Sequence, residues 1–395
     1  MKSGIRICAL VTVVGMYSAA AHAQSKVTLY GILDEGVMFL NNVGGPTGGK
    51  KIFLDSTSGI NGSRFGFTGV EDLGGGLQAI FTLEPGLNIN NGQSAQGGTF
   101  LGRQAFVGLR SDLFGSLTFG RQYDMVLYFA QPVTTQGSQA GTAIFLHPGD
   151  LDNTGNSLRV NNSIRYMSPV YRGLSVGGEY SVGGVPGDGT ANSGYSVGVS
   201  YANGPFTFGG AFEYFKNPTS TTAGAGFFTG NANGASQLSQ SLNKGYASAS
   251  AYQTAVVGAG YAIGPVNVTA SWSNTQYAGL GGLLAGSAAH FNNVDFAVKW
   301  LATPALSFSA AYDYLKGESV NTTAGQTVGN QHYNQVMLMA DYLLSKRTDF
   351  YVEGAWQRAS GTSSTGAPAV ADIGNLGDSS NNHQLAIRAA LRHKF

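Results

Sequence analysis

The chain contains 395 residues, of which only 11% are charged and 59 are glycine, and its formal net charge at pH 7 is +1. Soluble globular proteins carry roughly 25% charged residues and about 7% glycine, so the composition argues against a soluble enzyme, and the near-neutral charge argues against a nucleic-acid-binding protein. Beyond residue 23 there is no run of about 20 apolar residues, which excludes a bundle of membrane-spanning helices. A transmembrane β-barrel reconciles these features, because each of its strands turns one face to lipid and the other to water.

The first residues have the features of a secretory signal peptide. Lys2 and Arg6 give a positively charged start, an apolar stretch follows, and Ala-His-Ala at 21–23 matches a signal cleavage site. We therefore expect a signal peptide at 1–23 and a mature chain at 24–395 that is exported to the outer membrane. The alternatives are a mitochondrial presequence and an uncleaved membrane anchor, but the apolar stretch is too short for an anchor.

Most of the remaining chain consists of short segments in which apolar and polar residues alternate, as in strands with one apolar and one polar face. In the segment 206–214, Phe206, Phe208 and Tyr214 share one face, and Glu213 lies on the other. The sixteen expected strands are 26–40, 59–71, 76–89, 97–111, 115–122, 160–168, 173–182, 194–202, 205–215, 245–261, 265–274, 290–301, 305–316, 331–343, 348–359 and 382–395.

The connections between these segments alternate in length. Tight turns at 202–205 and 262–265 contrast with long polar segments at 217–243 and 360–381. Short periplasmic turns and long external loops are typical of outer-membrane barrels, and an even number of strands brings both termini to one side. The sequence therefore predicts an all-β fold, a sixteen-stranded antiparallel transmembrane β-barrel.

The last expected strand divides its residues into an apolar face and a cationic face. Leu385, Ile387 and Leu391 share one face, whereas Arg388 and Arg392 lie on the other. Unpaired cations are costly in a soluble core but are well solvated beside a water-filled lumen.

Several motifs, taken in order, resemble those of the general diffusion porins of Gram-negative β-proteobacteria, the trimeric outer-membrane class of Burkholderia, Bordetella and Neisseria relatives. They are VTLYGILD (27–34), SRFGFTG (63–69), EDLGGGL (71–77), GRQAFVGL (102–109), FGRQY (119–123), NSIRY (162–166), YLLSKRT (342–348) and RHKF (392–395). The resemblance covers essentially the whole mature chain. It implies a channel for passive diffusion of ions and small hydrophilic solutes, with no cofactor.

The same resemblance implies partners for the chain. It implies a homotrimer that contacts outer-membrane lipid and lipopolysaccharide and is inserted by the barrel assembly machinery. A terminal aromatic residue, here Phe395, resembles the recognition signal that this machinery uses.

Porins of this class fold their third external loop into the barrel, and the matching segment here is 123–158. The resemblance places acids of this loop opposite a cluster of wall arginines, so that a transverse field acts on permeating solutes. The loop candidates are Asp124, Asp150 and Asp152, while His147 is expected to be a packing residue of the loop rather than a ligand.

Alternation indicates which arginines face the lumen. Arg64, Arg165 and Arg388 alternate with apolar neighbours and are therefore expected to point inward. Arg103 and Arg121 share the parity of their apolar neighbours, but the resemblance still places them at the constriction, re-aimed by a bulge or a strand end. Each arginine could alternatively be a solvated residue without effect on selectivity. Ion preference stays open, because wall arginines favour anions whereas the near-neutral total charge argues for little preference.

The sequence contains no recognisable catalytic or metal-binding motif. Its single cysteine, Cys8, lies in the expected signal peptide, and its six histidines lack zinc-site spacing. No Gly-x-Ser-x-Gly elbow marks a hydrolase nucleophile. Two alternatives to a channel are an outer-membrane enzyme with a catalytic site on one rim and an adhesin or structural barrel with a plugged lumen. Hydrolysis of lipid or peptide would identify the first, and absence of conductance the second.

Overall fold

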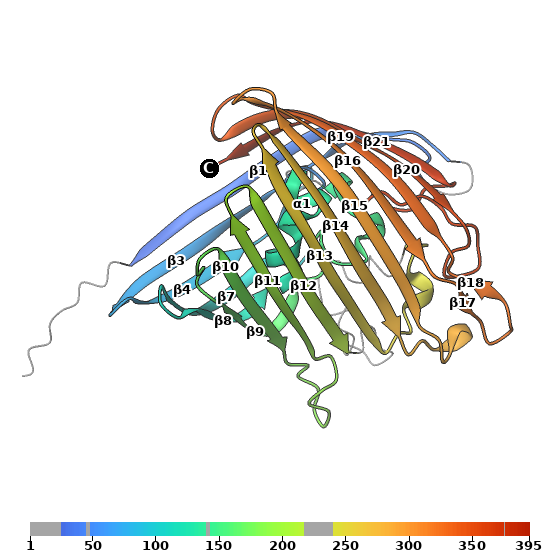
Figure 1. The fold of residues 1–395 in the computed structure, drawn as a ribbon, viewed down its shortest axis with the longest axis horizontal. Coiled ribbons are helices and arrows are strands. Elements are labelled where there is room, and N and C mark those ends of the chain that lie inside the picture. Colours follow the sequence, from blue (N-terminus) through green and yellow to red (C-terminus); the bar gives the residue numbers. More distant parts are fainter. Residues whose placement is uncertain (1–24, 45–47, 140–142, 217–239, 375) are drawn as a thin grey trace, which may run out of the picture.

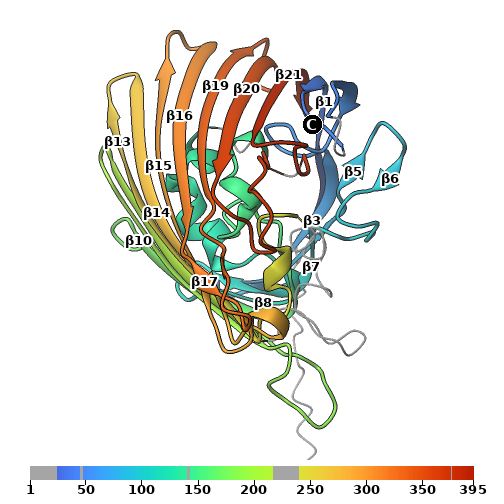
Figure 2. The same ribbon diagram turned by 90° about the vertical axis from the view of Figure 1, so that its right-hand side faces the viewer.

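The computed structural model describes residues 25–44, 48–139, 143–216, 240–374 and 376–395. The expected signal peptide at 1–23 and most of the expected loop at 217–243 lie outside this part of the chain. Within the described residues, antiparallel strands close into a tilted barrel that surrounds several short helices (Figures 1 and 2). No helix among the described residues is long and apolar enough to cross a membrane.

Sixteen strands make the barrel wall, and each pairs with its neighbours in antiparallel fashion. They are β1 (Lys26–Leu40), β3 (Arg64–Gly74), β4 (Leu77–Glu84), β7 (Gln104–Ser111), β8 (Gly115–Gln122), β9 (Val160–Met167), β10 (Leu174–Ser181), β11 (Gly194–Asn203), β12 (Phe206–Lys216), β13 (Ala251–Ile263), β14 (Val266–Ala278), β15 (Ala289–Leu301), β16 (Leu306–Gly317), β19 (His332–Leu343), β20 (Thr348–Ser360) and β21 (His383–Lys394). β21 pairs with β1, and this pairing closes the ring. The expected sixteen-stranded antiparallel barrel is confirmed.

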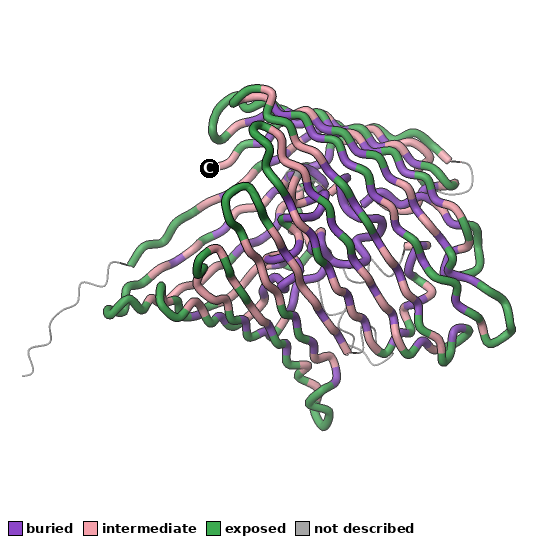
Figure 3. The backbone as a smooth tube through the Cα atoms, in the orientation of Figure 1, coloured by how far each residue is buried: buried purple, intermediate pink, exposed green. Residues whose placement is uncertain are grey.

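Residues on the two faces of the wall differ as the alternation predicts. On β15, Val294, Phe296 and Trp300 are exposed on the outer face, whereas Asn293 and Asp295 are buried on the inner face. The same alternation of exposed and buried residues runs along the wall in Figure 3. An apolar outer face of this kind matches the hydrocarbon core of a membrane.

One strand of the wall is interrupted. A further strand, β2 (Lys51–Asp55), and β3 pair with the same edge of β1. β2 pairs with residues 36–40 of β1, and β3 pairs with residues 26–32. The chain between β2 and β3, residues 56–63, leaves the wall, and we call it the inner excursion. The continuous strand expected at 59–71 is therefore wrong in its first half.

The inner excursion packs against the inner face of the barrel. The backbone N–H of Ile60 donates to the hydroxyl of Tyr351 on β20 at 3.2 Å, and Ile60 is fully buried. A Cβ added at Gly59 would lie 2.4 Å from Asp34 Oδ1, so only glycine permits this close approach to β1. Apart from Ile60, the residues of the excursion are small or polar and lack the alternating bulky side chains of a wall strand.

Three other expected strands are too long at one end. The strand expected at 76–89 ends at Glu84, the one at 97–111 begins at Gln104, and the one at 245–261 begins at Ala251. In each case the alternating pattern continues past the last pair of the hydrogen-bonded ladder.

Short elements fill the connections between wall strands. They are β5 (Leu87–Asn88), β6 (Gln93–Ser94), η1 (Val126–Ala130), η2 (Gln131–Val133), α1 (Thr135–Gln139), η3 (Ala143–Phe145), η4 (Pro148–Asp150), η5 (Lys244–Tyr246), η6 (Gly282–Leu284), β17 (Val320–Asn321) and β18 (Thr327–Val328). The helical elements η1 to η4 and α1 all belong to the connection between β8 and β9.

Candidate functional site

The segment 123–159 connects β8 to β9, and we call it the inner loop. Its described residues, 123–139 and 143–159, lie inside the ring of strands (Figure 2). Its helix η1 contacts β11 and β12, and α1 contacts β14, β15 and β16. Two strand glycines make room for it. A Cβ added at Gly198 would lie 2.3 Å from the Phe129 ring, and a Cβ added at Gly209 would lie 2.0 Å from the Phe129 carbonyl oxygen. The absence of side chains at these two positions therefore lets the loop lie close against the wall.

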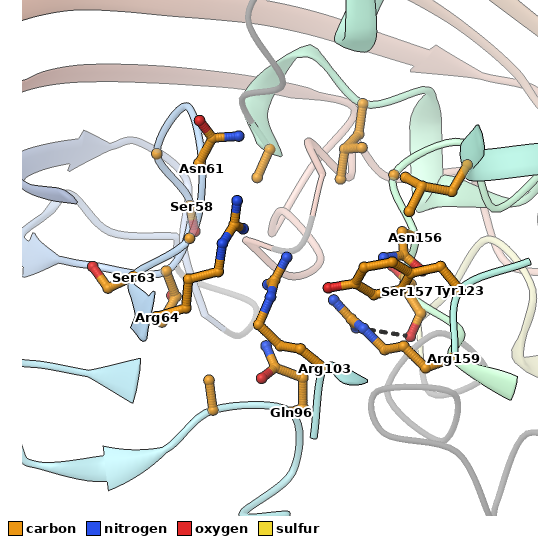
Figure 4. Close-up of a pocket in the computed structure, with 18 of the residues that line it drawn as sticks. Ser58, Asn61, Ser63, Arg64, Gln96, Arg103, Tyr123, Asn156, Ser157 and Arg159 are labelled. Atoms are coloured by element: carbon orange, nitrogen blue, oxygen red, sulfur yellow. Dashed lines mark hydrogen bonds between the residues drawn. The ribbon is translucent and has the colours of Figure 1, made fainter. Parts of the chain in front are cut away.

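A cavity of about 900 Å³ lies between the inner loop and the part of the wall that carries Arg64 and Glu84. Figure 4 shows Arg64 and Arg103 on one side of this space and Tyr123 and Arg159 on the other. Several residues of the inner excursion also line it. Three guanidinium groups from three separate segments of the chain thus converge on one polar space.

Glu84 is the only acid among the described residues that line the cavity. Its Oε1 accepts hydrogen bonds from Arg103 Nε at 2.8 Å and from the Tyr123 hydroxyl at 2.9 Å, and its Oε2 accepts one from the Tyr30 hydroxyl at 2.6 Å. Arg64 Nε lies 3.8 Å from the same Oε2. One carboxylate therefore orients two arginines while it offsets only one of their charges.

Arg159 and Glu84 line the cavity although neither is among the expected site residues. The Arg159 guanidinium lies 5.9 Å from the centre of the Tyr123 ring. Burial and then the nearby Arg103 lower the pKa of Arg159 to about 10, so this side chain keeps its charge at neutral pH. Arg159 lies at the junction of the long loop and the strand expected at 160–168. Alternation assigns no direction to a side chain at such a junction, so the sequence does not show that Arg159 faces the lumen.

The side chains of Arg103 and Arg121 do not follow the alternation of their strands, for two different reasons. Arg103 precedes the first residue of β7, so its side chain is free of the strand's alternation and reaches the cavity. Arg121 lies at a register shift of β8 between Gly120 and Gln122. Its Nε donates to the carbonyl oxygen of Gly102 at 3.0 Å, and Arg121 is not one of the residues that line the cavity.

The three acids expected in the inner loop are buried within it and do not line the cavity. Asp124 accepts hydrogen bonds from the Leu127 backbone at 3.0 Å and from Asn153 Nδ2 at 2.6 Å. Asp150 accepts from two backbone N–H groups of the loop, at 2.7 and 3.0 Å. The structure therefore differs from the expected arrangement of loop acids facing wall arginines, because donors inside the loop, most of them backbone N–H groups, bind Asp124 and Asp150.

The pKa values of these acids follow from their surroundings. Burial raises the pKa of Asp124 to about 6 and that of Asp150 to about 7, and for Asp150 the neighbouring Asp152 adds to the effect. For Asp152, burial acts in the same direction, but His147 outweighs it and lowers the pKa to about 2. Asp124 and Asp150 are thus partly protonated near neutral pH, whereas Asp152 is ionised.

Arg165 and Arg388 point inward, as alternation predicts, but both are covered. Arg165 lies under the inner loop, where its NH1 donates to the Tyr128 hydroxyl at 2.9 Å. Arg388 is fully buried, with its NH2 2.8 Å from Asp34 Oδ1 and its Nε 3.2 Å from Asp55 Oδ2. Neither lines the cavity, so these two arginines hold the inner loop and the start of the inner excursion against the wall.

His147 is buried where the inner loop meets the wall. Its Nδ1 lies 2.7 Å from Oδ2 of Asp152 in the same loop. Its Nε2 lies 2.5 Å from Oδ2 of Asp295 on β15 and 3.6 Å from Oδ2 of Asp313 on β16. Burial lowers the pKa of His147, but the carboxylates of Asp152 and Asp313 outweigh it and hold the pKa well above the usual value. His147 is therefore a charged link between loop and wall, and imidazole and carboxylate groups together form a donor set suited to a metal ion.

Phe395 completes the pairing of the last strand. Its backbone N–H donates to the Gly31 carbonyl at 3.0 Å, and its carbonyl accepts from the Gly31 N–H at 3.1 Å. A Cβ at Gly31 would lie 2.3 Å from Cζ of the Phe395 ring, so the ring lies directly over this glycine. The side chain of Phe395 remains 44% exposed at the barrel end, which leaves part of the ring accessible.

Comparisons with known proteins place the chain among bacterial outer-membrane proteins. The family model described as Gram-negative porin matches residues 9–362. An outer membrane porin protein of Bordetella pertussis is 35% identical over 210 residues, which are 48% of this chain, and the chain spans about half (54%) of that relative. The major outer membrane protein P.IB of Neisseria meningitidis is 26% identical over 393 residues, which cover 94% of this chain and 95% of the relative.

Solved structures agree with these matches in fold. The anion-selective porin from Comamonas acidovorans superimposes with a TM-score of 0.68 at 23% identity, covering 94% of this chain and 100% of that chain. OmpT, an outer membrane protein of Vibrio cholerae, superimposes with a TM-score of 0.63 at 13% identity over 94% of this chain and 98% of its own.

Proposed function

The chain belongs to the Gram-negative porin family, and from this premise we propose that it forms a water-filled channel in the outer membrane through which ions and small hydrophilic solutes diffuse passively. The observation that carries the proposal is the 900 Å³ polar cavity inside a closed wall whose outer face is apolar. Family membership points to a channel rather than to an enzyme.

The narrow part of this channel is the space between the inner loop and the wall arginines. Arg64 and Arg103 approach it from the wall and Arg159 from the end of the loop, while Glu84 is the one acid among the described residues of the lining. Three arginines against one glutamate leave a formal excess of two positive charges. The loop acids Asp124 and Asp150 do not reduce this excess at the cavity, because they are turned into the loop.

The excess positive charge supports a preference for anions. Charges of one sign around a narrow polar passage raise the local concentration of oppositely charged solutes and repel those of like charge. Arg103 and Arg159 donate hydrogen bonds to protein groups and Arg64 lies 3.8 Å from Glu84, so each passing anion is bound weakly and released rapidly, as conduction requires. We therefore infer a weakly anion-selective diffusion channel.

The proposal extends to the partners of the chain in the membrane. We infer a homotrimer in contact with outer-membrane lipid and lipopolysaccharide, exported by the signal peptide at 1–23 and inserted by the barrel assembly machinery. Apolar side chains on the outer faces of β3, β7 and β8, including Phe67, Val107 and Phe119, are exposed in the single chain and support a contact with lipid or with another subunit. The half-exposed ring of Phe395 supports a role in recognition by the assembly machinery.

Recording from planar lipid bilayers tests the function directly. Purified protein is expected to produce stepwise conductance increases and, under a salt gradient, a reversal potential that indicates preferential permeation of anions. A reversal potential of the opposite sign would contradict the assignment of selectivity to the cavity arginines. Complete absence of conductance from a folded barrel would contradict the channel itself.

A further inference from the structure

Two aspartates face each other across neighbouring strands on the inner wall. Asp295 on β15 and Asp313 on β16 are paired residues in the antiparallel register, so their side chains project side by side toward the inner loop. Both are buried, with exposed fractions of 5% and 0%. Like charges opposite one another on adjacent strands destabilise a sheet, and burial increases the cost. A positively charged partner therefore stabilises such a pair in its ionised form.

The inner loop supplies His147 and Asp152 to the same place. His147 lies between Asp152 on its own loop and the two wall aspartates, and the side-chain ligand atoms of His147, Asp295 and Asp313 all lie within 4.8 Å of one another. The ion pairs of these three carboxylates among the described residues are all with His147. Even a protonated imidazole offsets only one of three negative charges.

Some of the carboxylate oxygens in this cluster have no hydrogen-bond partner. Asp295 Oδ2 accepts from the backbone of Thr135 and from the Ser271 hydroxyl, but the buried Oδ1 of Asp295 accepts from no described group. Asp313 repeats the pattern, with Oδ2 accepting from Asn293 Nδ2 and a buried, unpartnered Oδ1. Buried oxygens without partners are costly, and a cation bound beside them would satisfy them.

We propose that His147, Asp295 and Asp313, with Asp152 beside them, bind one divalent metal ion that fastens the inner loop to the barrel wall. One imidazole nitrogen with carboxylate oxygens is a donor set for Zn²⁺, or for Mn²⁺ through the carboxylates, rather than for Ca²⁺, which prefers oxygen ligands alone. A metal ion with bonds of about 2.1 Å separates neighbouring ligand atoms by roughly 3.0–3.4 Å, so the 2.5 Å contact of His147 with Asp295 would open by about 0.5–0.9 Å.

Binding replaces a proton by a metal ion at His147. The imidazole ligates through Nε2, which must lose its proton, while Nδ1 keeps the proton that it donates to Asp152. Two ionised aspartates on the wall then balance the charge of the ion. Because the ligands come from β15, β16 and the inner loop, the ion is a cross-link between the loop and the barrel wall. This site stands apart from the permeation pathway, since none of its four residues lines the arginine cavity.

Metal binding to the full-length detergent-folded protein tests the proposal. Protein treated with EDTA, and protein refolded with metal present, are titrated with Zn²⁺ and with Mn²⁺, and bound metal is counted by mass spectrometry. One ion per chain is expected, with release of a proton on binding and with much weaker binding of Ca²⁺. A wild-type protein that takes up neither ion under either regime would overturn the proposal, whatever its conductance.

Variants identify the site. Asp313→Asn and His147→Gln should each lower the affinity about tenfold or more, since loss of a mere hydrogen-bond partner of a ligand already costs about that much. Asp372→Asn is the matched control, because Asp372 is also fully buried and its carboxylate oxygens also lack partners. Binding that survives both site variants, and disappears when the surface histidines His332 and His383 are replaced by Asn, would overturn the assignment. If a site variant does not fold, the wild type alone is tested: proton release on binding and a Zn²⁺-dependent rise in its unfolding temperature are expected, and absence of both would overturn the proposal.

Discussion

Glu84 and Arg103 form an ion pair at the cavity, with 2.8 Å between Glu84 Oε1 and Arg103 Nε. The same carboxylate accepts hydrogen bonds from two tyrosines and lies 3.8 Å from Arg64. Removal of the acid and removal of an arginine therefore change the charge of the passage in opposite directions, which makes this pair a test of the proposed selectivity.

Neutralising Arg64 or Arg103 should reduce anion preference, and neutralising Glu84 should increase it. A unit charge about 8 Å from a permeating ion in a water-like medium changes its energy by about 0.5 kcal/mol, a roughly twofold change in ion occupancy. Reversal potentials of R64Q, R103Q and E84Q under a salt gradient check this expectation. Arg110→Gln is the control, because Arg110 is exposed and bound to Gln78 outside the cavity. Equal shifts in R110Q and R64Q would contradict the assignment.

Replacing Arg388 should destabilise the barrel rather than change its selectivity. Loss of this guanidinium leaves Asp34 and Asp55 buried without their cation, and breaking a buried ion pair costs about 3–5 kcal/mol. Denaturant unfolding of R388Q in detergent, followed by circular dichroism, measures the loss. Arg358→Gln, which alters an exposed residue on β20, should unfold like the wild type. A large shift of reversal potential in a stable R388Q protein would instead place Arg388 at the passage.

The inner loop should be held more firmly in acid than at neutral pH. The pKa of Asp150 is raised to about 7 from an ordinary value near 4, so the folded loop binds a proton more tightly than the unfolded loop does. Its contribution to stability is therefore complete below about pH 4 and is lost as the pH rises through about 7. Asp124 acts in the same direction, with its loss ending near pH 6.

Hydrogen exchange of peptides from the inner loop, corrected for the intrinsic dependence of exchange on pH, measures this effect between pH 4 and 8. Exchange should increase with pH in the wild type and change less in D150N, which carries no titrating group at that position. Asp188→Asn is the control, since Asp188 lies in an exposed loop outside the barrel interior. Loop exchange that is independent of pH in the wild type would contradict the expectation.

Phe395 should matter for assembly in cells more than for folding in detergent. Phe395→Ala keeps both backbone hydrogen bonds to Gly31 and removes only the ring, so the variant should refold in detergent with nearly normal yield. In cells, its amount in the outer membrane should fall severalfold if the assembly machinery reads the ring, whereas Phe395→Tyr should restore it. Parallel losses in detergent and in cells would assign the ring a packing role over Gly31 instead.

Strand alternation predicted the wall well, because one face meets lipid and the other does not. Arg64, Arg165 and Arg388 all point inward as their parity indicates. Parity does not reveal what covers an inward residue, and distant segments decide that: the inner loop covers Arg165, whereas Asp34 and Asp55 enclose Arg388. Of these three, Arg64 alone faces the cavity.

The residues of the loop were harder to predict for a related reason. Outside strands no period assigns direction, so Arg159 could not be placed and the loop acids were expected in the lumen. The requirement to satisfy backbone N–H groups decided the orientation of Asp150, and this requirement depends on how the loop folds. In the sequence, only the polar character of the segment 123–158 indicates that it does not lie in the wall.

Because the chain leaves the wall between β2 and β3, the width of the passage can change there without disturbing the pairing of the wall strands. β1 keeps its hydrogen-bonded partners on both sides of the gap, while residues 56–63 form part of the cavity lining. Insertions or deletions in this stretch can widen or narrow the passage without shifting the register of any strand, whereas a change of one residue within a strand would reverse every side chain that follows it. The bore of such a barrel can therefore diversify in evolution by loop-length variation at a single point of an otherwise constant cylinder.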